Sequence, residues 1–144
     1  MLTTIAADGY PHSRPMTLQD VEFDGDVWFF ISRASVKVPE IRQDDRINIS
    51  IHEDSKYVSA SGRACIVEDR KKAEEMWNPL YKAYFPQGLD DPDLLLLKIP
   101  IERAEYWDSP GGTVTRLIGF VEAYVTGDTS KLGEHGNIRP KARR

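Results

Sequence analysis

The chain has 144 residues, of which 40% are apolar and 10% aromatic, enough to bury one core but hardly two. Its formal net charge of −4 argues against a general surface for nucleic acids or acidic membranes, which normally carries a basic excess. The single cysteine, Cys65, excludes an internal disulfide and suits a reducing cytoplasm. We therefore expect one cytoplasmic globular domain over residues 1–144, with no membrane span.

The N-terminal part of the chain predicts β structure. Residues 2–6 are short and β-branched, Asp8-Gly9 is a hairpin-type turn, and residues 12–19 resume an extended pattern. Asp24-Gly25 gives a second turn into VWFFIS, residues 27–32, whose continuous apolar run is typical of a strand covered on both faces. We expect that strand to be central in its sheet.

Three further extended segments follow. Residues 47–52 alternate isoleucine with polar residues, and residues 57–67 place small and apolar side chains on one face, so both predict half-buried strands. Gly62 indicates a bend or a close backbone approach, as expected where a sheet curls into a barrel. Residues 94–107 supply one more long strand. The pattern predicts a mainly β fold, a β-barrel of about six strands with flanking helices.

Helices are fewer. Asp69 can cap an amphipathic helix whose apolar residues recur at helical spacing, namely Ala73, Met76, Trp77 and Leu80. Pro39 suits the first position of a helix over residues 39–45, because proline there loses no helical hydrogen bond. We expect a third helix from about Thr115 to Val125, a turn-rich loop over residues 86–93, and a flexible basic tail from about residue 136.

A hydroxyl and an amine stand where the strand at residues 27–32 ends and the helix at Pro39 is expected to begin. Ser35 and Lys37 would then precede a helix N-terminus, where free N–H groups and the dipole favour an anion. Serine can donate its hydroxyl to a phosphate, and lysine supplies a compact positive charge. The alternative is that Ser35 only caps the helix while Lys37 is solvated.

A second segment, HSRPMTL at residues 12–18, carries Arg14. Together with VWFFISRASVKVPEI, it resembles the pyridoxamine 5′-phosphate oxidase-like flavoproteins, in particular their general stress protein branch. The resemblance continues through INISIHEDSKYVSASGRA and the DRKKAEEMW helix to AEYWDSPGGTVTRL and LGEHGNI. It implies an antiparallel, FMN-binding split barrel that forms a homodimer with the flavin at the subunit interface.

The resemblance also implies which residues bind the cofactor. By motif, Arg14, Ser35 and Lys37 look like contacts to the FMN phosphate or ribityl chain. Two runs of three residues would lie along the isoalloxazine ring, the first presenting its backbone and the second forming the next wall: Pro15, Met16 and Thr17, then Phe30, Ile31 and Ser32.

Other positions depart from the oxidase pattern or carry two interpretations. Tyr57 stands where the oxidase has a glutamine near the flavin, and Val36 replaces an arginine. Trp107 is similar in position to an aromatic residue that approaches FMN from the partner subunit, but it equally suits a core or interface tryptophan. After Arg116-Leu117 the chain lacks the histidine of the oxidase's substrate-phosphate motif, which argues against vitamin B6 oxidation.

Flavin redox chemistry requires no acid or nucleophile from the protein, because the conjugated flavin ring itself carries the electrons or hydride. The sequence therefore indicates no catalytic residue. The three histidines, His12, His52 and His135, form no catalytic set and no metal-binding spacing. The leading hypothesis is an FMN-dependent oxidoreductase whose redox partner is a small molecule or reduced nicotinamide. A non-catalytic flavin carrier or stress-linked sensor is the competing class, and deazaflavin or haem are minor alternatives to FMN.

Overall fold

The computed structural model describes residues 1–19, 25–53, 56–108 and 136–138. Its strands are β1 (Leu2–Ile5), β2 (Pro11–Arg14), β3 (Asp26–Ser32), β4 (Arg46–Glu53), β5 (Lys56–Arg63), β6 (Cys65–Val67), β7 (Leu94–Asp108) and β8 (Gly136–Ile138). Its helices are α1 (Lys37–Gln43) and α2 (Arg70–Met76), with two 3₁₀ helices, η1 (Pro79–Ala83) and η2 (Gly88–Asp90).

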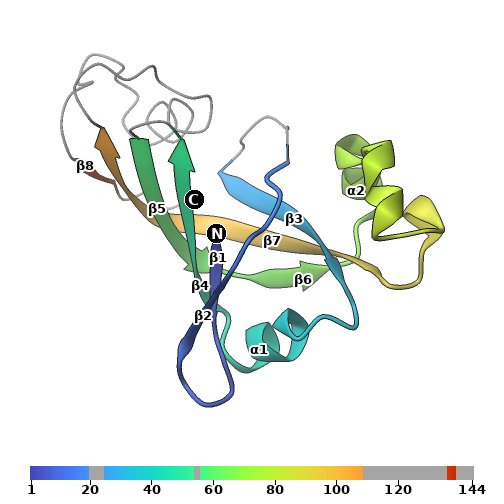
Figure 1. The fold of residues 1–144 in the computed structure, drawn as a ribbon, viewed down its shortest axis with the longest axis horizontal. Helices are drawn as coiled ribbons and strands as arrows, with labels where there is room; N and C mark the ends of the chain where they lie inside the picture. Colours follow the sequence, from blue (N-terminus) through green and yellow to red (C-terminus); the bar gives the residue numbers. More distant parts are fainter. Residues whose placement is uncertain (20–24, 54–55, 109–135, 139–144) are drawn as a thin grey trace, which may run out of the picture.

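The sheet curls into a half-barrel with the two α-helices against it (Figure 1). Six strands follow the order β2-β1-β4-β5-β7-β3, while β6 and β8 pair with β7 off this path. All of these pairings are antiparallel. The mainly β, split-barrel fold class predicted from the sequence is confirmed.

The N-terminal hairpin is shorter than predicted. Strands β1 and β2 pair across a turn in which Gly9 has a φ of 85°, a conformation that a residue with a side chain rarely adopts. Strand β2 ends at Arg14 instead of continuing to Gln19. Pro15 explains the early end, because proline has no N–H to donate to a neighbouring strand.

In the part of the chain that the structure describes, strand β3 is buried on both faces but lies at the end of the strand order and not in its predicted central place. Among the described residues it pairs with β7 alone. Its alternating side chains enter two separate clusters. Val27, Phe29 and Ile31 join the main core, whereas Trp28 and Phe30 pack with Ala73 and Met76 of α2. Burial of both faces therefore comes from two packing layers, not from two neighbouring strands.

Gly62 sits at the bend of the sheet, as predicted. The β5–β7 register shifts between Ser61 and Gly62, and a Cβ at Gly62 would lie 2.1 Å from the Pro100 carbonyl oxygen. Only glycine permits so close an approach of two backbones. After Ala64 the chain continues into β6, which pairs with the first part of β7. The long strand β7 thus belongs to both sides of the curled sheet.

Helix α1 begins earlier than predicted. It starts at Lys37, with Val36 as its N-cap residue, so Pro39 occupies the third helical position instead of the first. Proline is tolerated there because the first four N–H groups of a helix have no helical acceptor. Lys37 is therefore part of the first turn, and only Ser35 lies outside the helix.

Helix α2 is capped by Asp69 as predicted, with a 2.9 Å hydrogen bond from the Lys72 N–H to the carboxylate. It ends at Met76 instead of reaching Leu80, because Pro79 disfavours helical backbone before it and Asn78 caps η1. The Leu80 side chain is 79% exposed, so its predicted place on the packed face is wrong.

Two sequence-based expectations lie partly or wholly beyond the described residues. The helix expected over residues 115–125 falls outside them, as do tail residues 139–144, whereas residues 136–138 form β8. In the part of the chain that the structure describes, no helix has the length and apolar character needed to cross a bilayer.

Candidate functional site

A cavity of about 360 Å³ lies between the segment after β2, the end of β3 and the 3₁₀ helix η1. Its volume falls in the range of small-molecule sites, roughly 300–1,000 Å³. Eight of the eleven residues predicted to bind the cofactor line it: Pro15, Met16, Thr17, Phe30, Ile31, Ser32, Ser35 and Lys37. The fold thus brings together three segments that the sequence separates.

An aromatic wall completes the cavity, and the sequence analysis missed it. Tyr81, Tyr84 and Phe85, from η1 and the residues just after it, also line the cavity. The Phe30 ring anchors this wall, with its centroid 4.9 Å from that of Tyr81 and 6.4 Å from that of Phe85. The i, i+3, i+4 spacing of these three aromatics could have indicated a helical face.

Gln19 ties the aromatic wall to the segment after β2. The Tyr81 hydroxyl donates to Gln19 Oε1 at 3.0 Å, and Gln19 Nε2 donates to the Thr17 carbonyl oxygen at 3.2 Å. Gln19 itself lines the cavity. Two chain segments far apart in sequence, both lining the cavity, are therefore joined by a hydrogen bond.

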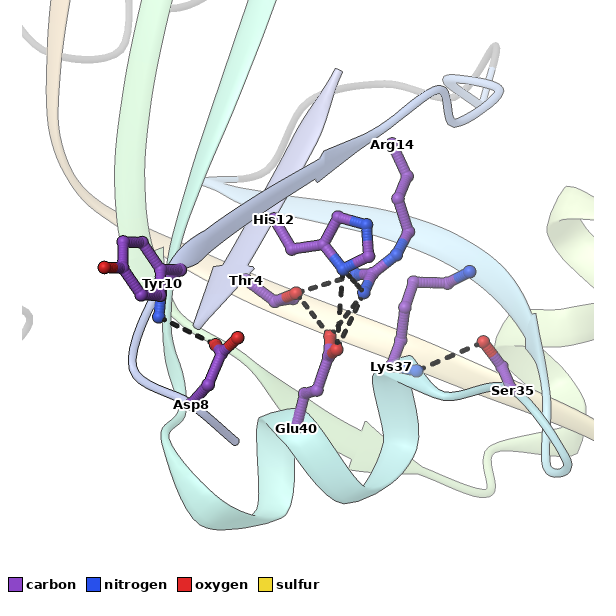
Figure 2. Close-up of polar contacts among 8 residues, drawn as sticks. All are labelled: Thr4, Asp8, Tyr10, His12, Arg14, Ser35, Lys37 and Glu40. Carbon is purple, nitrogen blue, oxygen red and sulfur yellow. Dashed lines mark hydrogen bonds and ion pairs between the residues drawn. The ribbon is translucent and has the colours of Figure 1, made fainter. Parts of the chain in front are cut away.

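Ser35 and Lys37 form a polar end of the cavity. The Lys37 backbone N–H donates to Ser35 Oγ at 3.3 Å, so the Ser35 side chain satisfies the first N–H of α1 (Figure 2). The N-cap residue itself, Val36, makes no side-chain cap. Within the described part of the chain, the Lys37 ammonium makes no hydrogen bond or ion pair. Burial lowers the pKa of Lys37, and the Arg14 charge lowers it further against the opposing effect of Glu40. A half-buried ammonium in this setting is stabilised by a nearby anion.

Arg14 lies beside the cavity, outside its lining, and Glu40 holds its guanidinium (Figure 2). Arg14 Nη2 donates to both Glu40 carboxylate oxygens, at 2.8 and 2.7 Å, and Nη1 donates to Thr4 Oγ1 at 2.7 Å. The Arg14 and Glu40 side chains are only 14% and 13% exposed. Glu40 therefore pairs directly with Arg14, and Lys37 is the cation of the two that has no carboxylate partner within hydrogen-bond or ion-pair distance among the described residues.

The environment of Glu40 keeps its carboxylate ionised. Burial raises the pKa of Glu40, but hydrogen bonds from Thr4 and Arg14 and the charges of Arg14 and His12 outweigh it. The net pKa is below the ordinary value of 4.5. The sequence offered no signal for this cluster, because Arg14 and Glu40 lie 26 residues apart.

Asp93 is a second acidic residue that the sequence analysis placed only in a turn. It lines the cavity, and its carboxylate accepts hydrogen bonds from the Ser32 hydroxyl and from the Ala34 N–H, the latter at 3.1 Å. Its backbone oxygen accepts from the Arg33 N–H at 2.7 Å. Ser32, predicted to face the ring, therefore directs its hydroxyl hydrogen toward Asp93.

The other two predicted residues, Tyr57 and Trp107, lie outside this cavity. They face each other across the β5–β7 ladder and line a separate hollow of about 550 Å³. Tyr57 stacks on His52 with ring centroids 4.3 Å apart. Tyr57 is 47% exposed and Trp107 is 40% exposed, so a single chain presents an aromatic surface here.

The whole set of described residues contains no group of three or more His, Cys, Asp or Glu side chains that could hold a metal ion. The charged groups near the cavity are instead Lys37, Arg14, Glu40 and Asp93. Their arrangement places an ammonium that makes no ion pair in the described residues next to a hydroxyl and an aromatic wall, which suits an organic ligand with an anionic end.

Comparison with known families matches residues 1–131 to the family described as pyridoxamine 5′-phosphate oxidase like. The chain belongs to this family. The match covers nearly all of the described fold, including every residue predicted to bind the cofactor. The family predicted from the sequence is confirmed.

Solved structures of general stress proteins share the fold. A general stress family protein of Xanthomonas campestris pv. campestris is 30% identical, over 80% of this chain and 81% of that chain, with a TM-score of 0.66. The general stress FMN/FAD binding protein of Xanthomonas citri is 28% identical, over 80% and 82%, with a TM-score of 0.66. General stress protein 26 of Bacillus anthracis is 26% identical, over 73% and 80%, with the same TM-score. No curated protein matches the chain.

Proposed function

We propose that this member of the pyridoxamine 5′-phosphate oxidase-like family binds FMN and transfers electrons or hydride between FMN and a small molecule or nicotinamide. The Lys37 ammonium carries the proposal. It is half-buried and lacks a hydrogen-bonded counter-ion among the described residues, at one end of a cavity walled by aromatic and apolar side chains. The flavin-binding relative from Xanthomonas citri supports the same ligand class.

The residues of the cavity fit FMN in their chemistry. Met16, Phe30, Ile31 and Phe85 offer apolar contact to a flat conjugated ring. At the polar end, Ser35 and Lys37 offer a hydroxyl and a charge to a phosphate. A terminal phosphomonoester carries more negative charge on a single phosphate than either of the two internal phosphates of FAD, so a single compact cation favours FMN.

When bound, FMN supplies the redox chemistry, because its ring takes up electrons or hydride without a protein nucleophile. The residues of the chain would bind FMN and orient it. The buried rings of Phe30 and Phe85 shield their side of the cavity from water, and the Gln19–Tyr81 hydrogen bond joins two of the segments that line it. Lys37 holds an anion without a competing carboxylate hydrogen bond in the described structure.

The proposal includes a homodimer in the cytoplasm, with the flavin at the subunit interface. Tyr57 and Trp107 are large aromatic residues that stay exposed in one chain, and exposed aromatic surface of this kind marks interfaces. In such a dimer, Trp107 would approach FMN from the partner subunit. Cys65 is an exposed free thiol, which suits a reducing compartment.

A spectroscopic experiment tests the proposed function. The purified protein, as isolated and after incubation with FMN and desalting, should show a flavin absorption spectrum, and mass measurement of the released chromophore should identify FMN. Absence of a flavin in both samples would contradict the proposal. Anaerobic mixing of the FMN-loaded protein with reduced nicotinamide should then bleach the spectrum. Persistent failure with several reductants would favour the non-catalytic carrier or sensor.

A further inference from the structure

We infer that Asp93 is a positioning residue for the anion-binding end of the cavity, an inference that rests on the proposed function. Asp93 directly precedes β7, which begins at Leu94, and lies 61 residues from Ser32 in sequence, yet it contacts the chain where β3 leads into α1. A turn there, residues 33–36, connects Ser32 to Lys37. The Asp93 carboxylate is one of the groups that tie this turn to the segment before β7.

Three contacts join Asp93 to the last residue of β3 and the first two residues of the turn. One carboxylate oxygen accepts from the Ser32 hydroxyl, and the other accepts from the Ala34 N–H at 3.1 Å. The Asp93 backbone oxygen accepts from the Arg33 N–H at 2.7 Å. Both carboxylate oxygens are thus used within one turn, which fixes three consecutive residues against the sheet.

The order imposed by Asp93 reaches Ser35 and Lys37 through a short series of hydrogen bonds. The Ser35 N–H donates to the Ser32 carbonyl oxygen at 3.0 Å, and the Lys37 N–H donates to Ser35 Oγ at 3.3 Å. The Val38 N–H donates to the Ser35 carbonyl oxygen at 3.0 Å. Loss of the Asp93 carboxylate releases the first members of this series, and with them the placement of the Ser35 hydroxyl.

Removing the Asp93 carboxylate should change the affinity for an anion in opposite directions, depending on whether Asp93 acts by positioning the turn or by its negative charge. Asp93 lines the same cavity as Lys37, so its negative charge repels an anion bound there. Removing that charge would strengthen anion binding if Coulomb repulsion were its main effect. If Asp93 positions the turn, removing it weakens anion binding instead, because the donors of the turn lose their alignment.

The experiment measures FMN and riboflavin affinities of wild type, Asp93→Asn and Asp93→Ala by flavin fluorescence quenching. Riboflavin has the ring without the phosphate and reports the rest of the cavity. Asp90→Asn is the matched control, because it removes one negative charge nearby while the Asp90 side chain is 82% exposed and pairs with Arg70. Hydrogen exchange of residues 32–37 reports the order of the turn directly.

We expect Asp93→Ala to lower the FMN-to-riboflavin affinity ratio by about tenfold, the effect of one lost hydrogen bond to a charged group. The ratio for Asp93→Asn should lie between those of Asp93→Ala and wild type, and the ratio for Asp90→Asn should equal that of wild type. Hydrogen exchange of residues 32–37 should be faster in Asp93→Ala than in wild type. An unchanged or raised ratio in both Asp93 variants would overturn the inference alone. Failure of wild type to bind either flavin would overturn the proposed function and the inference with it. If the Asp93 variants do not fold, Ser32→Ala takes their place, with the same expected fall and the same overturning result.

Discussion

At the scale of single residues, Glu40 determines which cation beside the cavity is available to an anion. Arg14 and Lys37 both lie close to the cavity, and each disfavours the charge of the other. Glu40 takes two hydrogen bonds from Arg14 and faces only weak competition from solvent. Lys37, whose ammonium turns away from Glu40 in Figure 2, is left as the charge that we propose binds the anion.

The first prediction concerns the stability of this ion pair. Glu40→Gln should lower the free energy of unfolding by about 1–3 kcal/mol at neutral pH, because the Arg14 guanidinium loses its counter-charge in a largely buried position. The folded-state pKa of Glu40 is depressed, so its contribution is fully present above its unfolded value and is lost as pH falls through the folded value. Urea titrations of both proteins should therefore diverge above the ordinary pKa of 4.5 and converge in more acidic solution.

Glu75→Gln serves as the control. The Glu75 side chain is 50% exposed, and its carboxylate oxygen lies 3.4 Å from Lys72 Nζ. Such surface pairs contribute little. Equal losses in the two variants, or a Glu40→Gln loss that does not change between neutral and acidic pH, would contradict the assigned role of Glu40.

What the sequence could reveal at this scale depended on local motifs. Ser35, Lys37 and the Pro15–Thr17 run stand in short recognisable segments, and all of them line the cavity. The partners of these residues could not be read in the same way. Glu40 and Asp93 reach Arg14 and Ser32 across 26 and 61 residues, so only the fold brings them into contact.

At the scale of elements, the bend in β5 depends on one glycine. The second prediction is that Gly62→Ala lowers the free energy of unfolding by about 1–3 kcal/mol, the cost of forcing extra volume into packed structure. The added methyl group would meet the Pro100 carbonyl oxygen, and the β5–β7 register shift leaves the backbone little room to yield.

Gly9→Ala is the comparison for Gly62→Ala. Its Cβ would meet nothing within 4 Å, so only the positive φ of 85° opposes the change. Thermal and urea unfolding should rank Gly62→Ala as the less stable variant. The reverse ranking would show that close packing at the bend is not what requires glycine there.

The sequence predicted which segments form strands and helices better than it predicted where each one ends or which strands pair. The apolar run of β3 indicated burial correctly, but it could not separate a central strand from one covered by the main core on one side and α2 on the other. Helix ends followed competing local signals. The apolar spacing predicted that α2 would continue to Leu80, but the helix ends at Met76, before Asn78 and Pro79. Pro39 predicted the start of α1, but the helix begins two residues earlier, at Lys37.

At the scale of the whole molecule, the third prediction is a dimer in solution. Light scattering of the wild type at micromolar concentration should give twice the chain mass, because the surface around Tyr57 and Trp107 exposes large aromatic side chains. Trp107→Arg should shift the mass toward the monomer, whereas Leu80→Arg, at an apolar residue that is 79% exposed on η1, should not. A monomeric wild type would contradict the proposed interface.

The most direct test of FMN binding at Lys37 is a titration of FMN and riboflavin into wild type and Lys37→Ala. The variant should bind FMN more weakly by about 1.5–3 kcal/mol, the range for a hydrogen bond to a charged group, while its affinity for riboflavin stays the same. Lys71→Ala, which removes an exposed lysine of α2, controls for net charge and should behave as wild type. The same FMN-to-riboflavin preference in Lys37→Ala as in wild type would contradict phosphate binding at Lys37.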